Sequence, residues 1–205
     1  MKKLLLTALS VIFAIPAFAQ LGLGVKAGIG GNHPQSMYDF HYTYGGSVST
    51  HDYFGGLEAF YEKPLNFDFL GDPREYDEHK IGIKIGFEKY GKNTYTAGSN
   101  KATEKTIALP VTAYYKYAPE TTRFDFIAGA GISFFRSDVS IDDENDYKWK
   151  GVLHLLTGIE YNLSQHFALG FDLKYITPSA RIKKYNLVYS DRSGFNEAIT
   201  ARYYF

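Results

Sequence analysis

The chain has 205 residues, with 22 basic and 22 acidic side chains and no cysteine. A formal charge of zero argues against a nucleic-acid partner, because surfaces that bind nucleic acids carry an excess of Lys and Arg. The lack of cysteine excludes disulfides and any zinc or redox site built from thiolates. The length predicts a single domain, and the composition is unusual in its 18 Tyr, 16 Phe and 20 Gly.

Residues 1–19 have the three parts of a secretory signal peptide. They open with two lysines, continue as an apolar run up to Ile15, and end in the small-x-small sequence Ala-Phe-Ala at 17–19. The apolar run is shorter than the ~20 residues that a membrane-spanning helix needs. We therefore expect residues 1–19 to be removed on export, and residues 20–205 to form the mature domain.

The C-terminal segment, GFNEAITARYYF, alternates in hydrophobicity up to the last residue. Side chains of a strand point to opposite faces in turn, so Ile199, Ala201, Tyr203 and Phe205 share one face. This ending resembles the closing strand of bacterial outer-membrane β-barrels, which pairs with the first strand and leaves no sheet edge. The resemblance implies that Tyr203 and Phe205 form the assembly signal read by the barrel assembly machinery.

The same alternation recurs along the chain, and no later apolar run is long enough for a spanning helix. The pattern predicts an all-β fold, but alternation fits an apolar face turned inward in a soluble barrel as well as one turned toward lipid. The signal peptide and the terminal Phe favour lipid, and we expect a closed antiparallel up-and-down transmembrane β-barrel of about eight strands. Ten strands are the alternative, if residues 41–50 and one further segment also pair. The eight segments are 21–31, 53–63, 80–90, 106–117, 123–135, 147–161, 166–177 and 194–205.

Polar stretches separate these segments and predict their connections. Long loops outside and short turns in the periplasm are typical of outer-membrane barrels. Pro110 lies within a predicted strand, where it removes one ladder donor or marks a bulge. The expected long loops are 32–52, 91–105, 136–146 and 178–193, and the expected tight turns are 118–122 and 162–165.

The face opposite the apolar one carries charges of both signs. A charge buried without a partner costs several kcal/mol, so we expect these side chains to pair across the lumen. The pattern predicts a charge network that fills a narrow barrel, with a polar path for small solutes as the alternative. The residues concerned are Lys26, Glu58, Lys84, Glu88, Lys116, Arg123, Asp125, Lys150, Glu160, Asp172, Lys174 and Arg202.

One histidine and one acidic run are the candidates for chemistry. His154 could act as a base oriented by Glu160 or Asp172. It falls in mid-strand rather than at a rim, and no serine stands two residues on, so we predict no enzymatic activity. The acidic run at 142–146 lacks the spaced ligands and the glycine of a calcium loop. We expect a solvated acidic surface loop, and no metal or cofactor site. Contact of this loop with the divalent ions that bridge lipopolysaccharide is an alternative.

Residues 109–176 resemble the outer-membrane protein W group of small β-barrels. The resemblance rests on LPVTAYYKY, RFDFIAGAGISFF, and the single Trp followed by GIEYNLSQHFALGFDLKYI, and it covers about a third of the chain. It implies a protein of the Gram-negative outer membrane that passes small hydrophobic molecules through the barrel or out of its side. Membrane lipids would then be its surroundings. The alternative is a structural or adhesive barrel that acts through its surface loops.

We expect deletion of Phe205 to lower the amount of protein in the outer membrane and to increase aggregate in the periplasm. The physical reason is that the alternation marking the closing strand ends on this ring. Immunoblots of outer-membrane and periplasmic fractions measure both quantities. Unchanged assembly would show that the terminal aromatic residue is not the signal.

Overall fold

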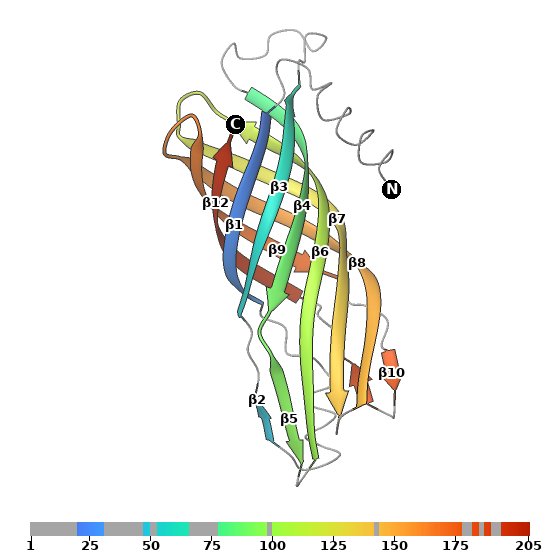
Figure 1. Cartoon of the computed structure of the whole chain (residues 1–205). Coiled ribbons are helices and arrows are strands. Elements are labelled where there is room, and N and C mark those ends of the chain that lie inside the picture. Colours follow the sequence, from blue (N-terminus) through green and yellow to red (C-terminus); the bar gives the residue numbers. More distant parts are fainter. Residues whose placement is uncertain are drawn as a thin grey trace, which may run out of the picture.

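The computed structural model describes residues 20–30, 47–49, 53–65, 78–97, 100–141, 144–177, 182–184, 187–189 and 194–205. The predicted signal peptide lies outside these residues and stays a prediction. The described part of the chain forms twelve β-strands (Figure 1). Within it, no helix is long and apolar enough to cross a membrane.

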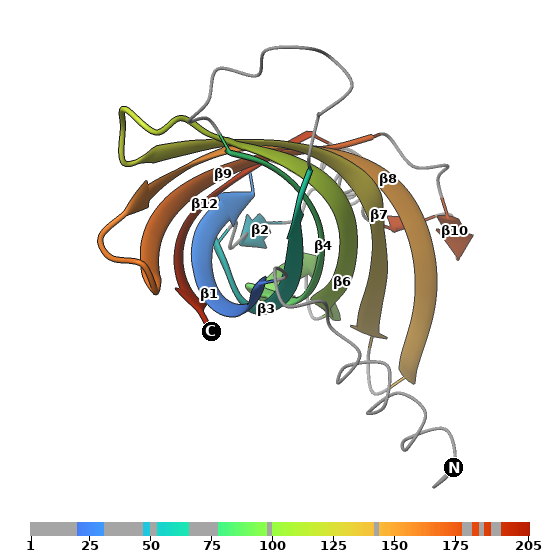
Figure 2. The same cartoon turned by 90° about the horizontal axis from the view of Figure 1, so that it is seen from above.

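Eight of the strands close into a barrel, as the sequence predicts (Figure 2). Neighbouring strands are antiparallel, and the last barrel strand pairs with the first through, for example, Tyr203 and Leu23. In order around the wall they are β1 (Gln20–Gly30), β3 (Tyr53–Pro64), β4 (Glu78–Tyr90), β6 (Asn100–Ala118), β7 (Phe124–Ile141), β8 (Glu144–Asn162), β9 (Phe167–Ile176) and β12 (Gly194–Tyr204).

The start of β1, at Gln20, and the C-terminus, at Phe205, lie at the same end of the barrel, which we call the terminal end. There the backbone N–H of Phe205 donates to the carbonyl oxygen of Leu21 over 2.9 Å. The opposite end is the loop end. The predicted short turns, between β6 and β7 and between β8 and β9, are confirmed at the terminal end.

The two faces of the wall are the reverse of those in a soluble barrel. On β12, Ile199 and Phe205 are 69% and 67% exposed, whereas Arg202 is 2% exposed. The other barrel strands repeat this pattern, with exposed Leu, Ile, Val and Phe outside and charged residues inside. Such an apolar surface is unfavourable in water and favourable against the hydrocarbon of a bilayer. The backbone tolerates the bilayer too, because the closed ladder satisfies its N–H and C=O groups without water.

The apolar belt on the outside has the height of a membrane. On β6 it runs from Ile107 to Tyr117, which is eleven residues and matches the ~9–11 that a tilted strand needs to cross. The limit of the belt toward the loop end is marked on β7 by Arg136. This residue stands in register with Ile107 and Trp149 and forms an ion pair with Asp138 at 2.9 Å. Charge therefore replaces apolar side chains at the edge of the belt.

Two predicted long loops, 91–105 and 136–146, are wrong. β5 (Asn93–Ala97) forms a hairpin with the first part of β6, and β2 (Ser47–Ser49) pairs with β5. The strands β7 and β8 continue until only residues 142–143 separate them. These parts form a sheet that projects beyond the barrel at the loop end (Figure 1). A sheet outside the bilayer needs no lipid-facing stripe, so hydrophobic alternation does not reveal it.

The structure also decides three smaller points. The last predicted long loop, 178–193, contains a short hairpin of β10 (Ile182–Lys184) with β11 (Leu187–Tyr189). Of the ten-strand alternative only the pairing holds: β2, within 41–50, and β5 do extend the sheet to ten described strands, but both lie beyond the barrel, which has eight. Pro110 makes no bulge, since the register between β4 and β6 is the same on both sides of it. It interrupts the ladder only by its missing donor.

We predict that Leu155→Arg lowers the free energy of unfolding by ~2–4 kcal/mol if Leu155 lies at the bilayer midplane, and by less toward either interface. Leu155 and Leu169 are both exposed on the lipid-facing side, and we expect Leu169→Arg to lower the free energy of unfolding in the same way. Chemical unfolding in lipid vesicles measures the change. Thr103→Arg, on β6 beyond the belt, is the matched control and should change stability by less than ~0.5 kcal/mol. Equal effects at 155 and 103 would contradict the membrane assignment.

Candidate functional site in the barrel lumen

Ten charged side chains from seven of the eight barrel strands meet inside the barrel. The five cations and five anions are nearly fully buried, and their charges cancel. Alternation along each strand puts them at inward positions. The set consists of Lys26, Lys84, Lys116, Lys174 and Arg202, with Glu58, Glu62, Glu88, Glu160 and Asp172.

Arg202 on β12 lies at the centre of this network. Its Nε donates to Oε1 of Glu58 at 2.5 Å, its Nη2 to Oδ2 of Asp172 at 2.7 Å, and its Nη1 to Oε1 of Glu160. A guanidinium holds its donors in a rigid planar fork and can therefore serve three acceptors at once. At Gly24, a Cβ would come within 3.2 Å of Cγ of Arg202, so this glycine leaves room for the arginine.

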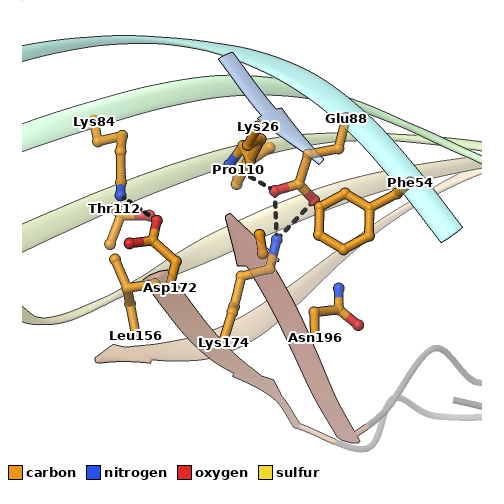
Figure 3. A pocket seen from close by; sticks show the side chains of 11 residues that line it. Lys26, Phe54, Lys84, Glu88, Pro110, Thr112, Leu156, Asp172, Lys174 and Asn196 are labelled. Carbon is orange, nitrogen blue, oxygen red and sulfur yellow. Dashed lines mark hydrogen bonds and ion pairs between the residues drawn. The ribbon is translucent and has the colours of Figure 1, made fainter. Parts of the chain in front are cut away.

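Toward the loop end the network centres on Glu88. Lys174 donates to both carboxylate oxygens of Glu88 at 2.7 Å, and Lys26 donates to one of them at 2.9 Å (Figure 3). The hydroxyl of Tyr90 donates to the other oxygen at 2.9 Å, and the side-chain amide of Asn196 donates to Tyr90 at 2.8 Å. The acceptors of this carboxylate are therefore fully used.

Toward the terminal end, Lys116 holds two carboxylates together. Its Nζ lies 2.6 Å from Glu62 and 2.8 Å from Glu160. It also donates to the hydroxyl of Tyr204, which in turn donates to Glu160, both at 2.7 Å. Tyr114 completes the set by donating to Glu62 at 2.8 Å. Tyrosines thus supply the donors that the lysine cannot.

Apolar clusters flank the charges, one toward the loop end and one toward the terminal end. At the loop end, Phe54 stacks on Tyr90 with ring centroids 5.2 Å apart, within a cluster that also holds Phe135 and Ile176. At the terminal end, Phe60 packs edge-on against Tyr204 at 5.0 Å. Because these clusters keep water away, the charges between them depend on one another for stabilisation.

A small cavity remains among the charges. It has a volume of about 20 Å³, which is room for about one water molecule. Lys84 and Lys174, with their partners Asp172 and Glu88, line it together with Asn196 (Figure 3). The described residues around this cavity therefore leave no space for a solute larger than water.

The predicted lumen residues fall into three groups. Asp125 is buried and accepts from the amide of Asn162 at 2.9 Å, and Lys150 is a half-buried inward residue near the loop end. The prediction for Arg123 is wrong, since it is exposed in the turn before β7, where the ladder has ended. The other predicted residues belong to the network, and they are Lys26, Glu58, Lys84, Glu88, Lys116, Glu160, Asp172, Lys174 and Arg202.

The sequence reasoning missed the polar neutral partners of this network. Tyr90, Tyr114 and Tyr204 each stand two residues from a network charge on the same strand. Alternation therefore placed them inside as well, and that signal was available. They were missed because many Tyr in such a chain were assigned to the outer girdles.

His154 is buried between two hydroxyl groups. Its Nε2 lies 2.9 Å from Oγ1 of Thr112, and its Nδ1 lies 2.9 Å from Oγ of Ser133. The carboxylates of Glu160 and Asp172 are not among its partners, so the arrangement lacks an acid that orients the ring. Ser133 is 0% exposed. Among the described residues, no group of three or more His, Asp or Glu could hold a metal ion.

A family comparison agrees with this architecture. Residues 5–191 match the model of the outer membrane protein beta-barrel domain. The chain belongs to this family. The family locates the protein in the bacterial outer membrane, with the short-turn terminal end toward the periplasm and the loop end outside. It is broader than the W group, so the resemblance of residues 109–176 to that group stays a prediction.

Solved structures with a similar fold are small barrels of bacterial outer membranes. The N-terminal β-barrel domain of Pseudomonas aeruginosa OprF has a TM-score of 0.50 at 11% identity, over 91% of this chain and 99% of that chain. The attachment invasion locus protein Ail of Yersinia pestis has 0.48 at 11% identity, over 91% and 97%. Neisserial surface protein A has 0.44 at 17% identity, over 91% and 97%. A search of curated protein sequences gave no match.

We predict that Arg202→Met lowers the free energy of unfolding by about 3–5 kcal/mol, because three buried carboxylates lose their shared cation. Arg202→Lys should recover part of the loss, since one ammonium cannot reach all three. Denaturant titration in vesicles measures these differences. Arg123→Met removes the same charge from the exposed turn and should change stability by less than ~0.5 kcal/mol. If the two methionine variants were equally stable, the network would not hold the barrel together.

Proposed function

We propose that this outer-membrane barrel is a closed membrane anchor that acts at the cell surface through its projecting sheet. The observation that carries the proposal is the filled lumen. Five ion-paired cations and five anions lie between two apolar clusters, and the cavity among them has room for about one water. A barrel filled in this way offers no route along its axis, so its contacts with other molecules lie outside.

The length of three strands supports a role for the projecting sheet. β6, β7 and β8 have 19, 18 and 19 residues, whereas the belt on β6 takes up eleven. At ~3.3 Å per residue, the seven residues of β6 before Ile107 reach roughly 20 Å beyond the belt. Thr106 shares a hydrogen bond with Ser137 on β7 at 3.2 Å, which ties the sheet to the barrel rim. A rigid sheet presents a defined surface to a partner.

A second candidate is passage of small hydrophobic molecules through the side of the barrel. It is favoured by the interrupted ladder between β4 and β6, where Ile85–Val111 and Glu88–Ala108 are paired but Gly86 is not. Pro110 faces Gly86 there and also lines the lumen cavity. An opening at this place would connect the cavity with lipid. The closed lumen makes it the lesser candidate.

We expect the unmodified protein to show small or gated conductance in planar bilayers, well below that of a general porin. Glu160→Ala with Lys174→Ala should raise ion leakage and lower thermal stability together, because both side chains are buried in the network. The matched control is Arg136→Ala with Asp138→Ala, which removes an exposed ion pair without opening the lumen. A large ungated conductance in the unmodified protein would refute the closed anchor.

The surface role and the lateral route are separated by two further variants. Replacing residues 93–104 by a short turn should lower adherence of expressing cells to a surface while outer-membrane levels stay constant. Pro110→Val restores the missing donor and should leave adherence unchanged. If Pro110→Val instead reduced uptake of a hydrophobic dye, and the shortened hairpin changed nothing, lateral passage would replace the anchor as the function.

A further inference from the structure

One acidic side chain stands inside the lipid-facing belt. Glu197 on β12 points outward, as its exposure and the alternation of the strand show. Its neighbours along the strand are Phe195 and Ile199, which are 54% and 69% exposed. Across the ladders it stands opposite Ile29 on β1 and Leu173 on β9. The carboxylate is therefore surrounded by apolar side chains that face lipid.

The depth of Glu197 places it near the headgroups on the outer side. Phe195, the next outward residue toward the loop end, packs against Tyr175 with ring centroids 5.0 Å apart. Such aromatic pairs form the girdle at the membrane interface. Glu197 lies two residues below this pair, which is roughly 7 Å along the strand. A glutamate side chain that extends along the wall covers most of that distance.

A carboxylate at this depth needs a partner. Ionisable groups on the lipid side of a membrane protein are rare and are usually paired. Among the described residues, Glu197 makes no hydrogen bond or ion pair. On β4 the outward Lys89 lies past Phe87, the last apolar residue on the outer face of that strand. The lumen cations face the other side of the wall. Since no described residue of the protein supplies a partner, the surrounding membrane is the source that we consider.

We propose that Glu197 binds a divalent cation that it shares with the phosphate of an outer-leaflet lipid. Divalent Mg²⁺ and Ca²⁺ prefer hard oxygen ligands and take six or more of them. Glu197 supplies one or two, and lipid phosphate and water supply the rest. An anionic headgroup alone would be repelled by the carboxylate, whereas a cation between them attracts both the carboxylate and the phosphate. This lipid contact is separate from the proposed surface role of the projecting sheet.

The test compares the thermal stability of the full mature barrel with and without Mg²⁺ in two surroundings. One is phosphatidylglycerol vesicles, and the other is dodecyl maltoside micelles, which contain no phosphate. The readout is the midpoint temperature at which the folded band is lost in heat-modifiable gel mobility. In vesicles, Mg²⁺ in place of EDTA should raise the midpoint of the unmodified protein by about 2–4 °C more than that of Glu197→Gln. In micelles the two proteins should respond alike.

Each other outcome overturns the proposal. Asp138→Asn removes an exposed carboxylate beyond the belt and should keep the full response to Mg²⁺. If Glu197→Gln also kept it, the cation would act elsewhere. If the unmodified protein responded equally in micelles, the cation would not be shared with a lipid phosphate. If Glu197→Gln were the more stable protein in every condition, the carboxylate would have no cationic partner.

Discussion

A charge buried in the lumen must meet an opposite charge there, and this requirement connects the last strand to the rest of the barrel. Arg202 on β12 pairs with carboxylates from β3, β8 and β9. Without Arg202 the four lysines of the network would face five buried carboxylates, and the uncompensated charge would cost several kcal/mol. The seam between β12 and β1 thus closes on a lumen that is neutral only once Arg202 is in place. The strand with Tyr203 and Phe205 outside also brings the central cation inside.

This requirement bears on where the protein can meet other molecules. Paired charges and two apolar clusters fill the interior of the described barrel, which supports the proposal that the wall is a support rather than a conduit. Two outer surfaces remain, the sheet that projects beyond the belt and the lipid face around Glu197. The first is proposed to contact partners outside the cell, and the second to hold a lipid through a cation. Both depend on the wall staying closed.

The sequence was sufficient for the parts of the fold that touch lipid. The predicted segments 21–31 and 80–90 correspond to β1 and β4 within two residues at each end. Their alternation was readable because lipid demands an apolar residue at every second position. The continuations of β6, β7 and β8 beyond the belt were mistaken for loops. Outside the bilayer no such stripe is required, so polar residues there pair as strands without an apolar signal.

The sequence by itself also determined which side chains point inward, because the period of a strand is two. Only the tertiary structure decided which of the inward side chains pair with one another. Lys84 and Asp172 are 88 residues apart and meet at 3.0 Å because the register around the closed wall brings their levels together. Arg123 follows the same alternation yet lies outside, since its strand begins one residue later. Periodicity determines a side chain's face, whereas its height and its partner follow from closure of the barrel.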